Sequence, residues 1–238
     1  MGIAALSPLS LTTLWSELLG FALAIAFSPL HIALLLLLLL GPDPLRRGGL
    51  FVAAWIVVAA VEMTVLLSVG HGLLLPMTKG SDHRTGLDLL AAGGLLALAL
   101  NNLVGRGERG QATGPAWSAR LDGFSSMAML PLVGLSMAIQ VLSPDDLFLA
   151  FKAAAALLEA NLARSLEVLI TAVYSLATAA FLLLPLLAVV LLGSQRVQPL
   201  LQAVKAWLYR RADGLVGVIS LGLAVYLGWQ GVEGLRLS

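Results

Sequence analysis

The sequence predicts an all-α, polytopic integral membrane protein, and three observations support this class. Of its 238 residues, 59% are hydrophobic and 11% are charged, whereas about a quarter of the residues in soluble domains are charged. Apolar stretches of about 18 residues or more recur along the chain, and each is long enough to cross a hydrocarbon core as a helix. The unbroken leucine run from Leu34 to Leu40 lacks the alternation of a barrel strand, so the spans are helices.

Clusters of turn-forming and charged residues divide the chain into six predicted transmembrane helices. They lie at residues 15–40, 50–75, 86–104, 126–158, 165–193 and 213–232. Pro29 interrupts the first span, and the fourth is too long for one plain helix and contains Pro144, which predicts a break there. Before the sixth span, the apolar and basic residues of 197–211 are spaced as in a helix that lies in the cytoplasmic interface.

The sequence around Pro29 recurs around Pro144. Residues 24–31 read AIAFSPLH and residues 138–146 read AIQVLSPDD, with one residue inserted. The chain is therefore predicted to contain two three-helix repeats, at 1–104 and 126–238, joined by a cytoplasmic linker at 105–125. Because three is odd, the second repeat enters the membrane in the opposite sense. The prediction is a pair of inverted repeats with broken first helices, an architecture found in many secondary transporters.

The paired breaks are the predicted substrate or ion site. Proline removes a backbone donor from a helix, which frees carbonyl groups to face a cavity inside the bundle. The alternative is a structural kink whose neighbours satisfy the backbone. The predicted site residues are Ser28, Pro29, His31, Glu62, Ser143, Pro144, Asp145 and Asp146.

Glu62 is the most unusual of these residues, because it lies near the centre of the second span with no charge within a helical turn. An ionisable group at mid-membrane costs about 2.5–3.5 kcal/mol on insertion scales, so it needs a partner, a cavity or a function. Glu62 is suited to carrying a proton, or it is protonated and bonds to a neighbouring helix. His31 can take a proton, bind a metal or donate to a carbonyl, and the sequence does not identify a metal.

Asp145 and Asp146 follow Pro144 at the position equivalent to Leu30 and His31. Adjacent carboxylates in a broken helix form a cation or proton site, with Lys152 as an internal partner if the break bends the chain. The alternative is an ordinary helix N-terminus at the membrane surface, where acids are favoured by the helix dipole. The secondary candidates can instead bond helices together; they are Asn101, Asn102, Gln140, Lys152 and Tyr174.

Charge and cysteine content exclude several classes of function. A net charge of +1 is too balanced for a nucleic-acid partner, and the absence of cysteine excludes disulfides and thiolate metal sites. The loops contain no recognisable catalytic constellation, so neither an enzyme nor a cofactor is expected. Nine of the 14 basic residues fall in the loops after spans one, three and five. The positive-inside rule therefore predicts both termini on the non-cytoplasmic side of a bacterial plasma (inner) membrane.

Three segments resemble a known family of carriers. They are residues 26–32 (AFSPLHI), 44–55 (PLRRGGLFVAAW) and 142–147 (LSPDDL). They resemble the lysine-exporter (LysE) superfamily of small six-span transporters, and within it the GAP or sulfolipid-1-addressing protein (Sap) branch. The resemblance implies inverted three-helix repeats, export of a small molecule, ion or lipid-linked compound, and often a homodimer.

The second motif departs from that family in its charge. Related sequences commonly read Asn-Pro-Lys-Asn, whereas this chain has Asp145 and Asp146 after the proline. An acidic motif favours cations, amines or proton coupling. We therefore expect an exporter that carries a small solute or cation across the lipid bilayer, with proton coupling. The alternative is a lipid- or glycolipid-addressing or assembly factor that transports no solute.

Overall fold

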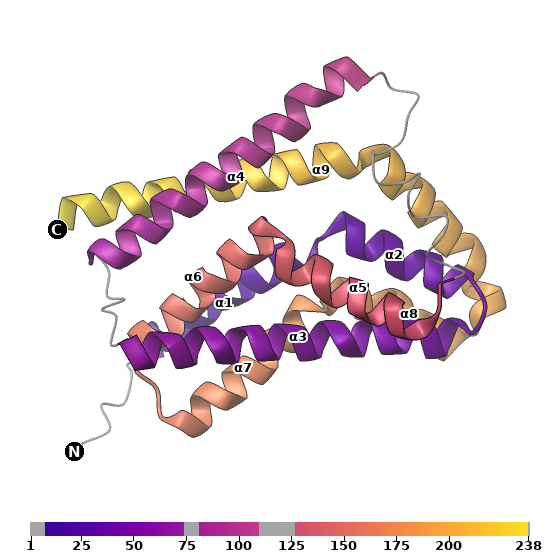
Figure 1. Cartoon of the computed structure of the whole chain (residues 1–238), viewed down its shortest axis with the longest axis horizontal. Coiled ribbons are helices and arrows are strands. Elements are labelled where there is room, and N and C mark those ends of the chain that lie inside the picture. The colour runs from indigo at the N-terminus through magenta and orange to yellow at the C-terminus, as the bar shows by residue number, and fades with distance from the viewer. Residues whose placement is uncertain (1–7, 74–80, 110–126, 238) are drawn as a thin grey trace.

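The computed structural model describes residues 8–73, 81–109 and 127–237, and the regular elements in these ranges are all helices. Figure 1 shows α4 and α9 side by side as one layer, with the other helices grouped against it. The helices are α1 (Pro8–Ala26), α2 (Pro29–Leu40), α3 (Pro44–Leu73), α4 (Asp82–Arg109), α5 (Met129–Leu142), α6 (Pro144–Ala160), α7 (Arg164–Thr178), α8 (Ala180–Leu192) and α9 (Ser194–Leu237). The predicted all-α class is confirmed over these ranges.

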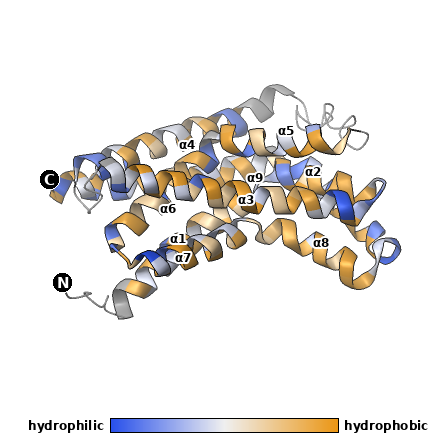
Figure 2. Ribbon diagram, turned by 60° about the horizontal axis from the view of Figure 1, so that its bottom comes forward, coloured by the Kyte–Doolittle hydropathy of each residue, from blue (hydrophilic) through white to orange (hydrophobic). Residues whose placement is uncertain are grey.

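The described helices supply three to five candidate membrane spans. Three helical segments are long and apolar enough to cross alone: Pro44–Gly72, Asp82–Val104 and Gly214–Leu237. Two further candidates are bent pairs, α1–α2 at 56° and α7–α8 at 67°. Hydrophobic residues dominate most of the helices, and hydrophilic residues gather towards the two ends of the bundle (Figure 2). The protein is therefore an integral membrane protein.

The chain breaks at both of the prolines that the sequence singles out. Helix α1 ends at Ala26 and α2 begins at Pro29, while α5 ends at Leu142 and α6 begins at Pro144. Proline lacks the N–H of an interior helical residue but is well suited to the first turn, so each proline starts a new helix. The fourth predicted span is accordingly two helices, of which α5 has only 14 residues.

The fifth predicted span also breaks, at Ala179, which the sequence analysis does not anticipate. The Thr178 hydroxyl donates to the carbonyl of Ser175 at 2.8 Å, and it accepts a bond from the indole Nε1 of Trp55 at 3.3 Å. Back-bonding by threonine bends a helix, and a tertiary partner holds the bend in place. The break therefore depends on a contact between α3 and α7 that no local pattern reveals.

The predicted helix at 197–211 and the predicted span at 213–232 are joined in one helix, whose candidate membrane span, Gly214–Leu237, begins close to the predicted start. Helix α9 is continuous from Ser194 to Leu237, a length of 44 residues. At about 1.5 Å per residue it is roughly twice as long as the membrane core is thick. Figure 1 shows its first part running at a steep angle to its second part. The predicted linker is also shorter, because 105–109 continue α4; residues 110–125 lie outside the described ranges.

The core is built around α2 and α6, the two helices that begin at the breaks. Residues 31–39 of α2 are all buried, and α2 packs against α3, α8 and α9. The small side chains of Ala153 to Ala156 are buried on α6, which packs against α1, α3 and α4. Short side chains allow helices to approach closely in a membrane, so the starts of both helices lie inside the bundle.

Candidate functional site

The two breaks have the same backbone conformation. Ser28 has φ −89° and ψ 106°, and Ser143 has φ −73° and ψ 110°, both extended. Each serine is the N-cap residue before the proline, and each serine carbonyl accepts the first helical bond at 3.0 Å, from Ile32 and Leu147 respectively. Neither serine side chain caps its own helix. The sequence repeat is thus matched by a local structural repeat.

Both breaks line one cavity in the interior of the bundle. Its volume is about 30 Å³, which is room for one or two water molecules. Ser28 and Pro29 contribute from the first break, and Asp145 and Asp146 contribute from the second. Leu95 of α4 also lines the cavity, as do four residues of α9, Val216, Ile219, the buried Ser220 and Leu223. The structure therefore brings together, as neighbours, residues separated by more than one hundred positions in the sequence.

Two buried carboxylates, one of them on the cavity wall, lie within electrostatic reach of each other. Asp146 is 5% exposed, and its Oδ2 has no hydrogen-bond partner. Glu62 comes from α3, where its Oε1 is also buried and unpartnered, and it lies close enough to Asp146 to interact electrostatically. Tyr174 of α7 is within electrostatic reach of both and has an unpartnered hydroxyl. Buried polar atoms normally have partners, which makes this cluster a candidate binding site.

The broken helix α5 adds two further polar side chains to the interior. Ser136 and Gln140 lie one turn apart on the buried face of α5, and each is 2% exposed. The Ser136 hydroxyl and the Gln140 Oε1 have no partner. Helix α5 packs against α3, the helix that carries Glu62. Helix α5 thus joins α3, α6 and α7 in contributing buried polar atoms without a hydrogen-bond partner.

A match to a known family covers nearly the whole chain, including the helices that form this site. Residues 18–233 match the family model described as Sap, sulfolipid-1-addressing protein. The chain belongs to the Sap family. No curated protein and no solved structure shows a significant match to the chain. Both helix breaks and all the residues of the carboxylate cluster lie within the matched range.

His31 of this Sap-family chain is fixed by its neighbours at the first break. Its Nδ1 lies 2.7 Å from the Ser28 hydroxyl, and its ring meets Trp55 edge-on with 4.3 Å between centroids. The residue is 1% exposed, and its Nε2 has no partner. Because Trp55 in turn bonds to Thr178, the histidine is anchored to α3 and, through it, to α7. Its Nε2 can bind one polar group.

Lys152 does not pair with Asp145 or Asp146, and this corrects the expectation from the sequence. It is 1% exposed and donates a hydrogen bond to Asp88 of α4. Six or seven residues of continuous helix separate Lys152 from the two aspartates, and no bend within α6 reverses its direction. Asp88 was not predicted as the partner of Lys152, although an acid in an apolar span is the signal that identifies it.

Arg84 extends this ion-pair network at the same end of α4. It is 3% exposed, pairs with Glu159 of α6 and lies 3.9 Å from Glu17 of α1. The network therefore ties α4 to α1 and α6. None of these three residues was singled out from the sequence, because the pairing depends on how the helices pack.

The remaining predicted residues lie apart from the carboxylate cluster or use their polar groups locally. The Ser143 hydroxyl donates to the Ile139 carbonyl at 2.8 Å, and the Asn102 amide donates to the Leu98 carbonyl at 2.9 Å. Asn101 is exposed on α4. Pro144 begins α6. Within the described ranges, no group of three His, Asp or Glu side chains is arranged to hold a metal ion.

Proposed function

We propose that this Sap-family protein is a secondary transporter that exports a small cationic solute from a central site between the two helix breaks. The observation that carries the proposal is the cavity lined by Ser28 and Pro29 of the first break and by Asp145 and Asp146, which directly follow the second. Discontinuous helices that meet near the centre of a bundle are the usual binding elements of inverted-repeat carriers. Membership of the wider lysine-exporter superfamily, with α5–α6 as a sixth span, is part of this proposal.

The contacts between helices support an inverted repeat. Under such a repeat α2 corresponds to α6 and α4 corresponds to α9. Helix α4 packs against α6, and α9 packs against α2, as an exchange of the two halves requires. The start of α1 and the end of α9 lie at the same end of the molecule in Figures 1 and 2. The positive-inside count assigns that end to the non-cytoplasmic side of a bacterial plasma membrane.

The charges of the site favour a cation over an anion. Asp145, Asp146 and Glu62 contribute three carboxylates, whereas Lys152 is engaged by Asp88 and is not a cavity-lining residue. Unpaired carboxylates are costly inside a membrane, so an empty site favours protons on these groups. A cation that enters replaces a proton. One site occupied in turn by a proton or by the solute gives exchange of the two across the membrane.

A proton-flux assay tests this proposal. Purified protein is reconstituted in proteoliposomes that contain a pH-sensitive dye and is challenged with amino acids, amines and mono- and divalent metal ions. We expect one class of cation to evoke proton movement, and Asp146→Asn to reduce the rate at least about tenfold. Asp82→Asn is the matched control, because Asp82 is an exposed acid of α4 away from the cavity. An undiminished flux in Asp146→Asn contradicts the proposal.

The second candidate is a lipid-addressing factor without solute transport, and the description of the Sap family favours it. Large apolar side chains are exposed along α9, including Val218, Val225 and Trp229, which is consistent with contact to lipid over a long helix. In this case the soluble panel evokes no flux, Asp146→Asn and Glu62→Gln are tolerated, and substitutions on exposed faces impair function instead.

A further inference from the structure

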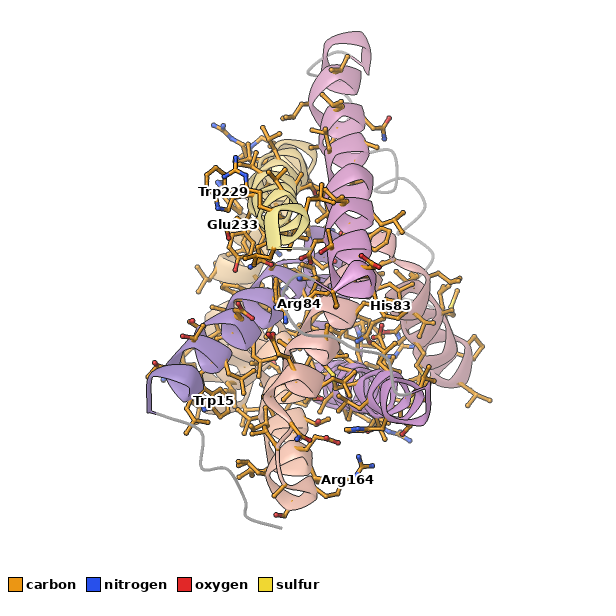
Figure 3. All side chains as sticks on the ribbon, turned by 90° about the vertical axis from the view of Figure 1, so that its left-hand side faces the viewer. Trp15, His83, Arg84, Arg164, Trp229 and Glu233 are labelled. Atoms are coloured by element: carbon orange, nitrogen blue, oxygen red, sulfur yellow. The ribbon has the colours of Figure 1, made fainter. Side chains whose placement is uncertain are left out.

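A second cavity lies between the start of α4 and the end of α9. Its volume is about 60 Å³, and it shares no lining residue with the cavity at the breaks. Arg84, Thr85 and Asp88 line it from α4, and Gln230 and Glu233 line it from α9. Figure 3 views this end of the molecule, with Arg84 below the paired helices and Glu233 and Trp229 on α9.

Two buried acceptor atoms of this cavity have no partner. Thr85 is 5% exposed, and its Oγ1 is unpartnered. A Cβ built on Gly234, another lining residue, would lie 2.4 Å from that oxygen, so the hydroxyl faces the cavity wall formed by α9. The Gln230 amide nitrogen donates to the Tyr226 hydroxyl at 2.7 Å, which leaves its Oε1 buried and unpartnered. The site therefore needs donors.

The charges around this cavity indicate the sign of the ligand. Arg84 is held by Glu159 and lies 3.9 Å from Glu17, and Lys152 donates to Asp88. Glu233 adds an exposed carboxylate to the wall. The charged residues that line the cavity are thus one cation, Arg84, and two carboxylates, Asp88 and Glu233. An anion has no donors to offer and meets a negative surplus, whereas a cation with N–H groups satisfies both requirements.

We propose that this cavity binds a primary ammonium group. An ammonium group has three N–H donors. They can donate to the Thr85 hydroxyl, the Gln230 carbonyl oxygen and the Glu233 carboxylate. The volume exceeds that of a single water site, which leaves room for an attached methylene chain. The neighbouring surface is apolar, since Leu237 of the cavity is 70% exposed and Trp229 is 63% exposed. The ammonium belongs either to a lipid headgroup such as phosphatidylethanolamine or to a soluble amine.

Lipid titration with native mass spectrometry tests the site on the whole detergent-solubilised protein. Phosphatidylethanolamine is compared with phosphatidylcholine, whose trimethylammonium group has the same charge but no N–H donor. We expect phosphatidylethanolamine to bind about tenfold more tightly or better, because charge-assisted hydrogen bonds distinguish the two. Thr85→Val and Glu233→Gln should each remove most of this preference. Thr64→Val is the control, since its hydroxyl is exposed on α3 and bonds only to the Ala60 carbonyl.

Free ethanolamine distinguishes a lipid headgroup from a soluble amine as the source of the ammonium group. Competition by ethanolamine against phosphatidylethanolamine supports the site and assigns it to soluble amines as well, whereas no competition supports a lipid headgroup. Glu233 is exposed, so Glu233→Gln should leave the fold intact even if Thr85→Val does not. Equal binding of the two lipids by the unmodified protein overturns the proposal, as does a preference that survives both variants. The result is independent of the transport proposal, whose site is elsewhere.

Discussion

Lys152 of α6 donates a hydrogen bond to the Asp88 carboxylate of α4 inside the bundle, where the two side chains are 1% and 5% exposed. A buried ion pair is costly to break, because the remaining partner becomes an uncompensated charge. Replacing both partners by apolar residues of similar size removes that charge. The pair therefore sets the alignment of α4 with α6 rather than adding a large net stability.

Single substitutions of this pair should be far more harmful than the double substitution. We expect Lys152→Met or Asp88→Leu to destabilise the protein by about 3–5 kcal/mol, and the double variant to recover most of that loss. Thermal unfolding of the detergent-solubilised variants measures the effect. A double variant as unstable as the sum of the single ones would show that the two groups act independently.

Gly231 lies at a close approach of α9 to α4. A Cβ at this position would lie 2.6 Å from the side chain of Leu89 and 3.4 Å from its backbone nitrogen. Gly231→Ala should therefore cost about 1–3 kcal/mol through overpacking. Gly222→Ala is the matched control on the same helix, because nothing lies within 4 Å of its Cβ position. Equal unfolding temperatures for the two variants would contradict the tight packing of α4 and α9.

The contact between Trp55 and Thr178 explains the bend between α7 and α8. Thr178→Val removes the acceptor of the indole N–H and leaves this buried donor unpaired, so it should cost about 1–3 kcal/mol. Thr64→Val, at an exposed threonine of α3, should cost much less. The unfolding temperatures of the two variants measure the difference. An equal loss of stability in both would contradict a stabilising role for the bond between Trp55 and Thr178.

Glu62 should link transport to pH if it carries the exchanged proton. Glu62→Gln keeps the size of the side chain and removes its titration, so transport should lose most of its dependence on external pH. The control is Asp82→Asn, which alters an exposed acid of α4 outside the cavity at the breaks. The rate is measured in proteoliposomes over a range of pH values. A pH profile unchanged by Glu62→Gln would exclude this role.

The sequence predicts the features of the fold that depend on local chemistry. Apolar runs identify the helices, and the effect of proline on a helix places breaks at Pro29 and Pro144, as the structure has them. The break at Ala179 was missed because it depends on a tertiary bond from Trp55. The sequence predicts an interfacial helix at 197–211 before the last span, whereas the structure joins the two in the continuous helix α9.

The candidate site was predicted in its composition but not in its contacts. Unusual residues in apolar surroundings identify Glu62 and Asp146, and the structure places them within electrostatic reach of each other. Tyr174 was only a secondary candidate, because a tyrosine in a membrane helix has several ordinary roles. Lys152 and Asp88 lie 64 positions apart in the sequence and on different helices. The spacing of residues along α6 alone therefore cannot predict that they pair.

Access to Ser220 from the two sides of the membrane tests the central claim most directly. The chain has no cysteine, so Ser220→Cys introduces a single thiol into the cavity at the breaks. If that cavity opens alternately to each side, a small membrane-impermeant thiol reagent should label this cysteine from either side of the bilayer. Ser175→Cys, equally buried but away from the cavity, should stay unlabelled. Labelling of Ser220→Cys from neither side, or from one side alone, would contradict a transport site between the two breaks.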